Sequence, residues 1–465
     1  MNYSLRFGID KIALFVLVVL ILSLPLFMRL ANDDSLFVGG ESFYDFRASE
    51  DLANKHYWDG MTDRLHQASF FYYLLAFLTL FMAKELFVGL SIILGIISAW
   101  LFYKILKRLI FQRETVIIST FLFIVSPGFI YLFSSFSIFS LATVLSLLSL
   151  FFYIKKNYWS LPFLMLISIT NFAFFICTLF LMTCFYFYDR DRKFFLTNMI
   201  ISIISFLSFY FLHPGFLVFK NLFFKASFMS LFTSFGSKIG IAFFYLFLGV
   251  TGFFVGWQRK KHHVYILISF MVLLLFSFFN PVGRIFSNLY LSVFSATLIY
   301  FLIKREWEIS IIKRFTLLLI FCGVIFSTSL YIDQTIHSEP QRELIESLEF
   351  LLPYEDGIVL SHDKYGFFIE FYANKRTFID EKSINYDNYN FLRDIQQNIF
   401  YSRNLELTES LLKENNIKYL LITPEMRTGL VWKREGEGLL FLLEKSDSFI
   451  RLTSDTEFEV WKFVN

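Results

Sequence analysis

Charged residues are scarce in this sequence. Only 17% of its 465 residues are charged, whereas soluble domains carry about 25%. Hydrophobic residues make up 56%, and phenylalanine alone contributes 66 residues. A globular core cannot bury that much apolar surface, so the composition excludes a soluble globular protein and indicates a chain largely embedded in lipid.

Cysteine is also rare. Its three occurrences, Cys177, Cys184 and Cys322, all lie in apolar runs, and the polar segments contain none. A disulfide framework in the polar segments is therefore excluded, and a cysteine in a hydrophobic helix most often serves as a small packing residue. The formal net charge is only +3, and we expect no nucleic-acid partner.

Apolar segments of about the length needed to cross a bilayer recur along the first 332 residues. There are eleven, at 12–30, 86–103, 115–133, 136–154, 158–170, 172–188, 195–212, 239–257, 264–279, 286–303 and 315–332. The first is too long for a signal-peptide core and lacks a following cleavage site, so we expect a retained spanning helix. One more run, 68–82, has only 15 residues, and the orientation of everything after it depends on whether it spans.

The basic residues predict that orientation. Five connections between apolar segments carry sixteen cations: Lys104, Lys107, Arg108, Arg113, Lys155, Lys156, Arg190, Arg192, Lys193, Arg259, Lys260, Lys261, Lys304, Arg305, Lys313 and Arg314. All lie on one side of the membrane if 68–82 does not cross, and the positive-inside rule makes that side cytoplasmic. The N-terminus is then cytoplasmic, and both the acidic loop 31–67 and the C-terminus are extracytoplasmic. If 68–82 spans instead, the same cations are stranded outside.

After residue 332 the composition changes, because charged residues occur throughout and long apolar runs end. Short apolar runs predict strands at 357–361, 376–380, 417–423 and 458–463, and amphipathic patterns predict helices at 340–352, 387–400 and 405–415. The expected fold is a polytopic α-helical membrane domain of about eleven spans, 1–332, followed by an extracytoplasmic soluble α/β domain, 333–465. The membrane domain includes the outer loop 31–85, with 68–82 as a non-spanning surface helix.

The first outer loop is the first candidate for chemistry. Residues 41–47 read Glu-Ser-Phe-Tyr-Asp-Phe-Arg, so an arginine follows an acid six residues later, shortly after the first apolar helix. A carboxylate at the membrane surface can act as a general base or as a metal ligand. A solvated acidic loop explains the same residues, and residue types alone favour that explanation.

A second candidate is Arg284, at the expected outer end of a helix pair. It lies in 280–286, which read Asn-Pro-Val-Gly-Arg-Ile-Phe. A guanidinium group matches phosphate oxygens in a bidentate geometry, so Arg284 can hold a phosphate at the membrane surface. The alternative is a cation that snorkels to the interface, which is the more common fate of such a residue.

The residues of the first loop resemble those of a known family. Segment 41–47 resembles the first-loop motif of membrane glycosyltransferases of the C-type (GT-C) fold, where an Asp or Glu after the first helix precedes aromatic residues and an Arg. Segment 66–76, His-Gln-Ala-Ser-Phe-Phe-Tyr-Tyr-Leu-Leu-Ala, is similar to the family's non-spanning surface helix without its two prolines. Segment 126–131, Ser-Pro-Gly-Phe-Ile-Tyr, resembles the end of its third helix.

The C-terminal domain carries a more specific resemblance. Segment 361–380 resembles the oligosaccharyltransferase catalytic subunit around its Trp-Trp-Asp-Tyr-Gly motif, with Asp363, a Tyr-Gly pair at Tyr365, and the later Asp380. Both tryptophans are absent, and Lys364 stands between the Asp and the Tyr. The resemblance implies an acceptor-side role for Asp363 and Tyr365, whereas the altered motif argues against recognition of the asparagine sequon.

Metal dependence stays open. In the oligosaccharyltransferases the second outer loop supplies carboxylates to a divalent metal, but here that loop, 133–138, reads Phe-Ser-Ser-Phe-Ser-Ile. A Mg²⁺ or Mn²⁺ site needs several oxygen ligands, including carboxylates. Either the enzyme is metal-independent, or Glu41 binds a metal together with Asp33, Asp34 or Asp45.

The resemblance thus implies a glycosyltransferase, of hexosyl or pentosyl type, that takes sugar from a polyprenyl-phosphate donor on the outer face of the membrane. Glu41 is the expected general base, and Arg284 and Arg47 are expected to bind the donor phosphate. Accessory candidates are Asp33, Asp34, Asp45 and His66. The expected partners are the lipid-linked sugar, membrane lipids and a glycan, lipid or protein acceptor in the cell envelope.

Two other functions remain as alternatives. One is an oligosaccharyltransferase that modifies asparagine, against which the altered Tyr-Gly motif and the acid-free second loop argue. The other is a transporter or a non-catalytic protein of the same fold. Transporters usually show internal repeats and charged residues in mid-membrane, and the sequence shows neither.

Overall fold

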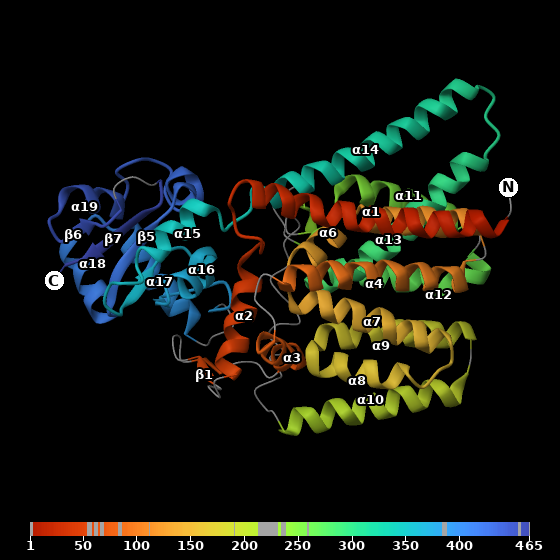
Figure 1. The fold of residues 1–465 in the computed structure, drawn as a ribbon, viewed down its shortest axis with the longest axis horizontal. Helices are drawn as coiled ribbons and strands as arrows, with labels where there is room; N and C mark the ends of the chain where they lie inside the picture. Colours follow the sequence, from red (N-terminus) through yellow and green to blue (C-terminus); the bar gives the residue numbers. More distant parts are fainter. Residues whose placement is uncertain are drawn as a thin grey trace. The chain divides into compact units, whose positions relative to one another are not determined.

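The computed structural model describes residues 3–53, 58–59, 64–65, 69–81, 86–110, 112–189, 191–212, 231–233, 239–257, 260–383, 388–453 and 457–464. The chain divides into two compact units. The helical unit comprises Met1–Leu30 and Gln67–His337, and the mixed unit comprises Ala31–His66 and Ser338–Asn465. Each is described by itself (Figure 1).

The helical unit contains a helix for each apolar segment expected from the sequence (Figure 1). Its helices are α1 (Tyr3–Ala31), α3 (Phe70–Thr79), α4 (Leu86–Leu109), α5 (Arg113–Ile124), α6 (Pro127–Ser134), α7 (Ile138–Ile154), α8 (Ser160–Thr170), α9 (Phe172–Asp189), α10 (Arg192–Leu212), α11 (Phe243–Trp257), α12 (Lys260–Ser277), α13 (Pro281–Lys304) and α14 (Ser310–Ile336). The expected third span is two helices, because α5 and α6 are bent by 56°.

Local sequence explains where these helices begin. At the bend, the Ser126 side chain accepts a hydrogen bond from the backbone N–H of Phe129, and Pro127 occupies the first turn of α6. Proline suits a helix start, where its missing N–H costs nothing. Asn280 caps α13 in the same way, accepting from the Val282 N–H, again with proline next in the chain. This cap places Arg284 in the first turn of α13.

The number of membrane spans is only partly established. Four of the described helices are long and apolar enough to cross a membrane, namely α1, α4, α13 and α14, and the α5–α6 pair makes a fifth if counted as one span. Six further apolar helices have 10–17 residues, so the expected total of about eleven stays a prediction. Helix α3 has 10 residues and is about 15 Å long, half the hydrocarbon thickness, and its expected non-spanning role stays a prediction.

Close packing between α11 and α13 depends on glycine. An added Cβ at Gly252 would lie 1.9 Å from the Phe294 carbonyl oxygen, and one at Gly249 would lie 2.3 Å from a Leu291 methyl group. Small residues at this spacing let two helix backbones approach closely in lipid, where packing drives association. The helix that carries Arg284 is therefore held firmly against its neighbour.

The mixed unit is built on a five-stranded sheet of order β4-β3-β5-β7-β6, with β3, β4 and β5 parallel and β7 antiparallel to β5 and β6. The strands are β3 (Ile358–Leu360), β4 (Arg376–Thr377), β5 (Ile417–Ile422), β6 (Phe449–Arg451) and β7 (Glu459–Phe463). The helices are α2 (Gly40–Ala53), α15 (Arg342–Glu349), α16 (Gly366–Tyr372), α17 (Tyr389–Tyr401), α18 (Leu405–Glu414) and α19 (Leu439–Lys445), and a small hairpin pairs β1 (Trp58–Asp59) with β2 (Arg64–Leu65). An α/β fold was expected here, but α16, α19 and β6 were not.

The division into units differs from the expected domain boundaries. The sequence placed the whole outer loop 31–85 with the membrane helices, whereas residues 31–66 group with the C-terminal segment. The reason is aromatic packing between α2 and α16. The Phe43 ring lies 5.4 Å from that of Phe368 and 5.0 Å from that of Phe371, measured between centroids. Buried aromatic pairs of this kind dominate packing energetics, so the aromatic motif of the first loop is a docking face as well as a candidate site.

Candidate functional site

Glu41 lies in the first turn of α2, within the mixed unit. Gly39 precedes it with a φ of +77°, a conformation that only glycine adopts at no steric cost, and its N–H donates to the Glu339 carbonyl at 3.0 Å. An added Cβ at Gly40 would lie 2.8 Å from the Phe367 ring. Both glycines are thus required to bring the chain into α2 against α16. The half-buried Glu41 carboxylate is held at a helix N-terminus, where the helix dipole favours negative charge.

Arg47 lies further along α2 and forms an ion pair with Glu370 of α16. The side chain of Arg47 is 11% exposed and that of Glu370 is 1% exposed. The sequence assigned Arg47 to the donor phosphate, and that assignment stays a prediction. In the structure its guanidinium donates to a buried carboxylate that sequence reasoning did not select, and the pair fixes the helix that carries Glu41.

The accessory acids of the first loop lie in different environments. The Asp33 carboxylate is 3.0 Å from the Arg342 guanidinium, and Asp34 accepts a hydrogen bond from the Arg342 backbone N–H at 2.9 Å. These two acids therefore secure the first turn of α15. Asp45 is 2% exposed on α2, and four residues after Glu41 it shares a face of the helix with it. His66 lies outside the described residues.

The described residues contain no ready-made cage of protein ligands for a divalent cation. Within the described parts of the chain, no group of three or more His, Cys, Asp or Glu side chains is arranged to hold a metal ion. Glu41 and Asp45 could supply two oxygen ligands from one helix face, but Asp33 and Asp34 are directed to Arg342. Mg²⁺ is commonly bound through one or two carboxylates, with waters and substrate phosphate oxygens completing its shell, so this pair is the part of the described chain that could contact such an ion.

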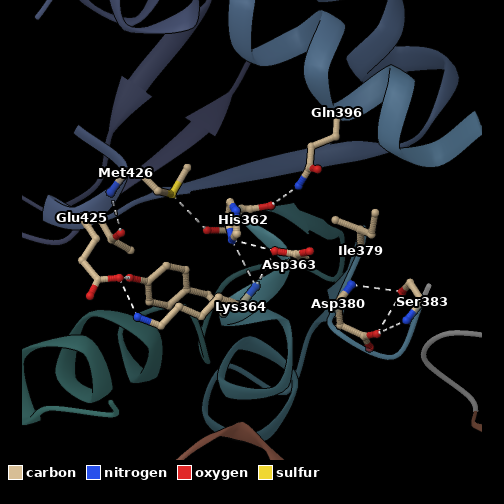
Figure 2. Close-up of polar contacts among 12 residues, drawn as sticks. His362, Asp363, Lys364, Ile379, Asp380, Ser383, Gln396, Glu425 and Met426 are labelled. Atoms are coloured by element: carbon tan, nitrogen blue, oxygen red, sulfur yellow. Dashed lines mark hydrogen bonds and ion pairs between the residues drawn. The ribbon is translucent and has the colours of Figure 1, made fainter. Parts of the chain in front are cut away.

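The expected acceptor-side residues belong to a polar cluster at the start of α16. The Tyr365 hydroxyl donates to the Glu425 carboxylate at 2.9 Å, and the Lys364 ammonium donates to the same carboxylate at 2.6 Å (Figure 2). Asp363 lies 2.7 Å from Nδ1 of His362. The inserted Lys364 therefore has a definite partner, Glu425, which follows β5 and which the sequence analysis missed.

The electrostatics of this cluster favour charged carboxylates. Burial alone would raise the pKa of Asp363, but the hydrogen bond and charge of His362 and the backbone N–H of Lys364 outweigh it and lower the pKa. Burial also acts to raise the pKa of Glu425, and Lys364 and Tyr365 reverse it, so that its pKa is lowered as well. The pKa of Tyr365 is raised, chiefly by burial and further by Glu425. The phenol therefore stays protonated and serves as a hydrogen-bond donor.

Two more residues of the segment that resembles the oligosaccharyltransferase motif, Gly366 and Asp380, have structural partners. The Asp380 carboxylate accepts hydrogen bonds from the Ser383 backbone N–H at 2.8 Å and from the Ser383 hydroxyl at 2.9 Å (Figure 2). It also accepts one from the Lys382 backbone N–H at 2.9 Å. Gly366 packs directly on it, since an added Cβ would lie 2.5 Å from the Asp380 Cβ. The Tyr-Gly step and the later Asp thus occur together because one packs on the other.

Arg284 lies in the helical unit and is only 9% exposed. Its Nε donates to the Ser277 carbonyl at 2.9 Å, and one terminal nitrogen donates to the Ile239 carbonyl at 3.2 Å. These bonds tie the end of α12 and the segment before α11 to the first turn of α13.

A cavity of about 400 Å³ in the helical unit is lined by residues from several helices, including Phe102, Leu147, Leu267 and Phe294. None of its lining residues is charged, and none was selected from the sequence as a site residue. Its polar lining residues are Gln112, Thr115, Tyr290 and Thr297, and without a charged group to act as base or to bind phosphate it is a weaker candidate for group-transfer chemistry than the residues above.

No protein-family model matches the sequence, and no curated protein matches it significantly. Several solved structures do resemble this chain. The oligosaccharyltransferase of Archaeoglobus fulgidus has a TM-score of 0.62 at 15% identity, covering 95% of this chain and 72% of that one. ArnT from Cupriavidus metallidurans bound to undecaprenyl phosphate has a TM-score of 0.57 at 12% identity, covering 99% and 98%. The mycobacterial arabinofuranosyltransferase AftD has a TM-score of 0.60 at 12% identity, covering 100% and 40%.

All three are glycosyltransferases with the C-type fold, so the fold resemblance inferred from the sequence motifs is confirmed. At these identities the likeness concerns the fold. The archaeal enzyme has also been solved with an inhibitory peptide and a dolichol-phosphate, and with zinc and sulfate.

Proposed function

We propose that this protein is a membrane glycosyltransferase that transfers a sugar from a polyprenyl-phosphate-linked donor to an acceptor on the outer face of the membrane. The observation that carries the proposal is the likeness to ArnT over nearly the full length of both chains, with 99% and 98% covered. That structure holds undecaprenyl phosphate. Because proteins with the same fold can have different functions, the proposal also rests on the site residues of this chain.

Glu41 is the proposed general base. Its carboxylate takes the proton from the acceptor hydroxyl or amide as the acceptor atom forms a bond to the anomeric carbon. The bond between that carbon and the phosphate oxygen breaks, and the electron pair leaves with the lipid phosphate. The Arg47–Glu370 pair and the glycines at 39 and 40 keep α2 in place, so the base is positioned before substrate arrives.

Arg284 is the proposed partner of the donor phosphate. Negative charge develops on the phosphate oxygen as the sugar departs, and a fixed guanidinium stabilises that charge without reorganising. Two of its donors already bond to backbone carbonyls, which restricts the side chain. No step is assigned to a metal, because no group of three or more potential metal ligands occurs in the described parts of the chain.

The cluster at Asp363 and Tyr365 is the proposed acceptor side. Tyr365 is fully buried and bonded to Glu425, so it positions that carboxylate and does not itself contact the acceptor. Asp363 and Lys364 are half-buried, and Glu425 is exposed. They present two carboxylates and one ammonium group toward solvent, a pattern that suits a polar acceptor with hydrogen-bond donors.

The asparagine-modifying alternative has one observation in its favour, the likeness to the archaeal oligosaccharyltransferase. The motif that reads the sequon in those enzymes has lost both tryptophans here. A peptide with an Asn-X-Thr sequon should therefore be a poor acceptor, and efficient glycosylation of it would favour this alternative.

A transfer assay tests the proposal. The purified full chain in lipid nanodiscs receives radiolabelled polyprenyl-phosphate sugars, with cell-envelope extract as acceptor, and matched reactions receive nucleotide sugars. We expect label transfer from the lipid-linked donor alone. Parallel reactions with EDTA measure metal dependence. Transfer from nucleotide sugars, or no transfer from any lipid-linked sugar across hexose and pentose donors, would contradict the proposal.

A further inference from the structure

The apolar cavity of the helical unit, with a volume of about 400 Å³, lies toward one end of the helices that line it. Its walls come from the last turns of α4, the first turn of α5, the second halves of α7 and α9 and the first half of α12. Each of these segments borders one of the basic connections in the sequence, whereas Arg284 lies in the first turn of α13, at the opposite end. The cavity is therefore separate from the residue proposed to bind the donor phosphate.

The interior of this cavity is apolar. Leu147 and Phe294 are among the buried side chains that line it. Two polar side chains in its walls already have partners, since the Thr297 hydroxyl donates to its own helix backbone at 2.9 Å and the Tyr290 hydroxyl hydrogen-bonds to Ser269 at 2.7 Å. Apolar cavities of this kind stay dry and bind apolar molecules, so the interior suits a hydrocarbon chain.

The cavity becomes polar where it reaches the start of α5. Gln112 is an exposed lining residue, and its side-chain oxygen accepts a hydrogen bond from the Thr115 hydroxyl at 3.4 Å. The segment 104–113, which supplies several lining residues, contains four basic residues and no acid. Two of them, Lys107 and Arg108, are exposed in the last turn of α4. This net positive charge attracts an anionic headgroup even where single cations also contact protein groups.

We propose that this cavity binds one acyl chain of an anionic glycerophospholipid, whose headgroup lies at the connection between α4 and α5. The ester region then lies at Gln112 and Thr115, and the phosphate lies by Arg108. Basic pockets between membrane helices on the cytoplasmic side bind anionic headgroups, and the positive-inside rule predicts that this end of the unit is cytoplasmic. The inference does not depend on the proposed function, because the donor phosphate is assigned to Arg284 at the other end of the helices.

The test titrates the purified, delipidated full chain in detergent with phosphatidylglycerol and counts bound lipid by native mass spectrometry. Phosphatidylcholine with the same acyl chains is the reference without net charge, and polyprenyl phosphate is the competitor. Leu147→Trp fills the cavity without changing charge, and Arg108→Gln removes a charge without filling the cavity. The matched controls are Leu318→Trp and Arg314→Gln, which change exposed residues of α14, a helix that supplies no lining residue.

A second measurement needs no variant. Wild-type protein is irradiated with a phosphatidylglycerol that carries a diazirine at the end of one acyl chain, and the cross-linked peptides are sequenced. We expect label on the lining segments of α7, α9 and α13. Label confined to other helices, such as the exposed faces of α1 and α14, would overturn the proposal even if Leu147→Trp fails to fold.

We expect phosphatidylglycerol to bind more tightly than phosphatidylcholine, and Leu147→Trp to lose it. Arg108→Gln should weaken its binding roughly fivefold, the effect of one basic residue near an anionic lipid, and both control variants should bind like the wild type. Equal binding of the two phospholipids would overturn the proposal, because charge would then select nothing. Displacement of phosphatidylglycerol by a lower concentration of polyprenyl phosphate would also overturn it, because the cavity would then hold the donor chain.

Discussion

Arg47 and Glu370 form a buried ion pair although 323 positions separate them in the chain. The pair joins the first loop to the C-terminal segment, and Phe43 of α2 packs on Phe368 and Phe371 beside it. The proposed base is therefore carried by a helix that belongs to the mixed unit. Changes in the C-terminal segment can alter catalysis without touching substrate, because they move the helix on which Glu41 lies.

The first prediction concerns this ion pair. Arg47→Ala leaves the Glu370 carboxylate buried without its guanidinium, and breaking one partner of a buried pair costs ~3–5 kcal/mol. The double variant Arg47→Met with Glu370→Leu should recover most of that loss, because an apolar pair of similar volume needs no counter-charge. Denaturant unfolding of the full chain, followed by protease sensitivity of the mixed unit, measures both. Equal stability of wild type and Arg47→Ala would show that the pair contributes nothing.

Much of the helical unit could be predicted from the sequence, since an apolar run that is long enough to cross a bilayer forms a helix. The break between α5 and α6 has a visible cause in Ser126 and Pro127, yet it was read as one span because its apolar run is continuous. In the mixed unit, the expected strands at 357–361 and 417–423 correspond to β3 and β5. Helix α16 was missed because seven residues are too few to show a helical period.

The candidate site was predictable only in part. Glu41 was selected by its place after the first helix, a local signal. The partner of Arg47 could not be found, because no sequence pattern relates residues 323 positions apart. Glu425 was missed for the same reason, because its role depends on hydrogen bonds from Lys364 and Tyr365 elsewhere in the chain.

The second prediction concerns acid. The pKa values of Asp363 and Glu425 are both lowered on folding, so the unfolded chain binds protons more readily than the fold. The two carboxylates then stabilise the fold above the unfolded pKa of about 4, and this contribution is lost as pH falls through the folded pKa values. Melting temperature against pH should show a decline below pH 4 that is smaller in Glu425→Gln. Identical pH profiles for variant and wild type would contradict the role of Glu425.

The third prediction concerns Arg284. Its replacement by Ala removes a charge-assisted contact worth ~1.5–3 kcal/mol, so donor binding should weaken roughly ten- to hundred-fold while acceptor binding changes little. Arg284→Lys keeps the charge but loses the fork that bonds to Ser277 and Ile239. It should therefore bind donor with intermediate affinity. Arg305→Ala, at the other end of α13, is the control. Unchanged donor affinity in folded Arg284→Ala would remove this residue from the site.

The fourth prediction concerns orientation. We expect the C-terminus to be extracytoplasmic and α3 not to cross the membrane, because that arrangement gathers sixteen Lys and Arg on the cytoplasmic side. Reporters that are active on one side only, fused after Asn465 and after Arg113, should give opposite results. The fusion at 113 is the internal reference, because it follows the basic connection after α4. A cytoplasmic signal from the fusion after Asn465 would overturn this orientation.

The fifth prediction concerns Glu41. Glu41→Gln keeps the shape of the side chain and its hydrogen bonding but cannot accept a proton, so transfer should fall by ~10²–10⁴ with little change in stability. Glu50→Gln is the matched control, since it makes the same change on the same helix nine residues later, on the opposite face. Polyprenyl-phosphate binding should survive in Glu41→Gln, because a base acts on the acceptor, and this separates it from the Arg284 variants. If a metal is bound by Glu41 instead, EDTA should abolish wild-type transfer, and the Gln variant should need more metal for half-maximal rate. Wild-type turnover in folded Glu41→Gln protein, with or without EDTA, would exclude both roles and leave α2 as a purely structural link between the first loop and α16.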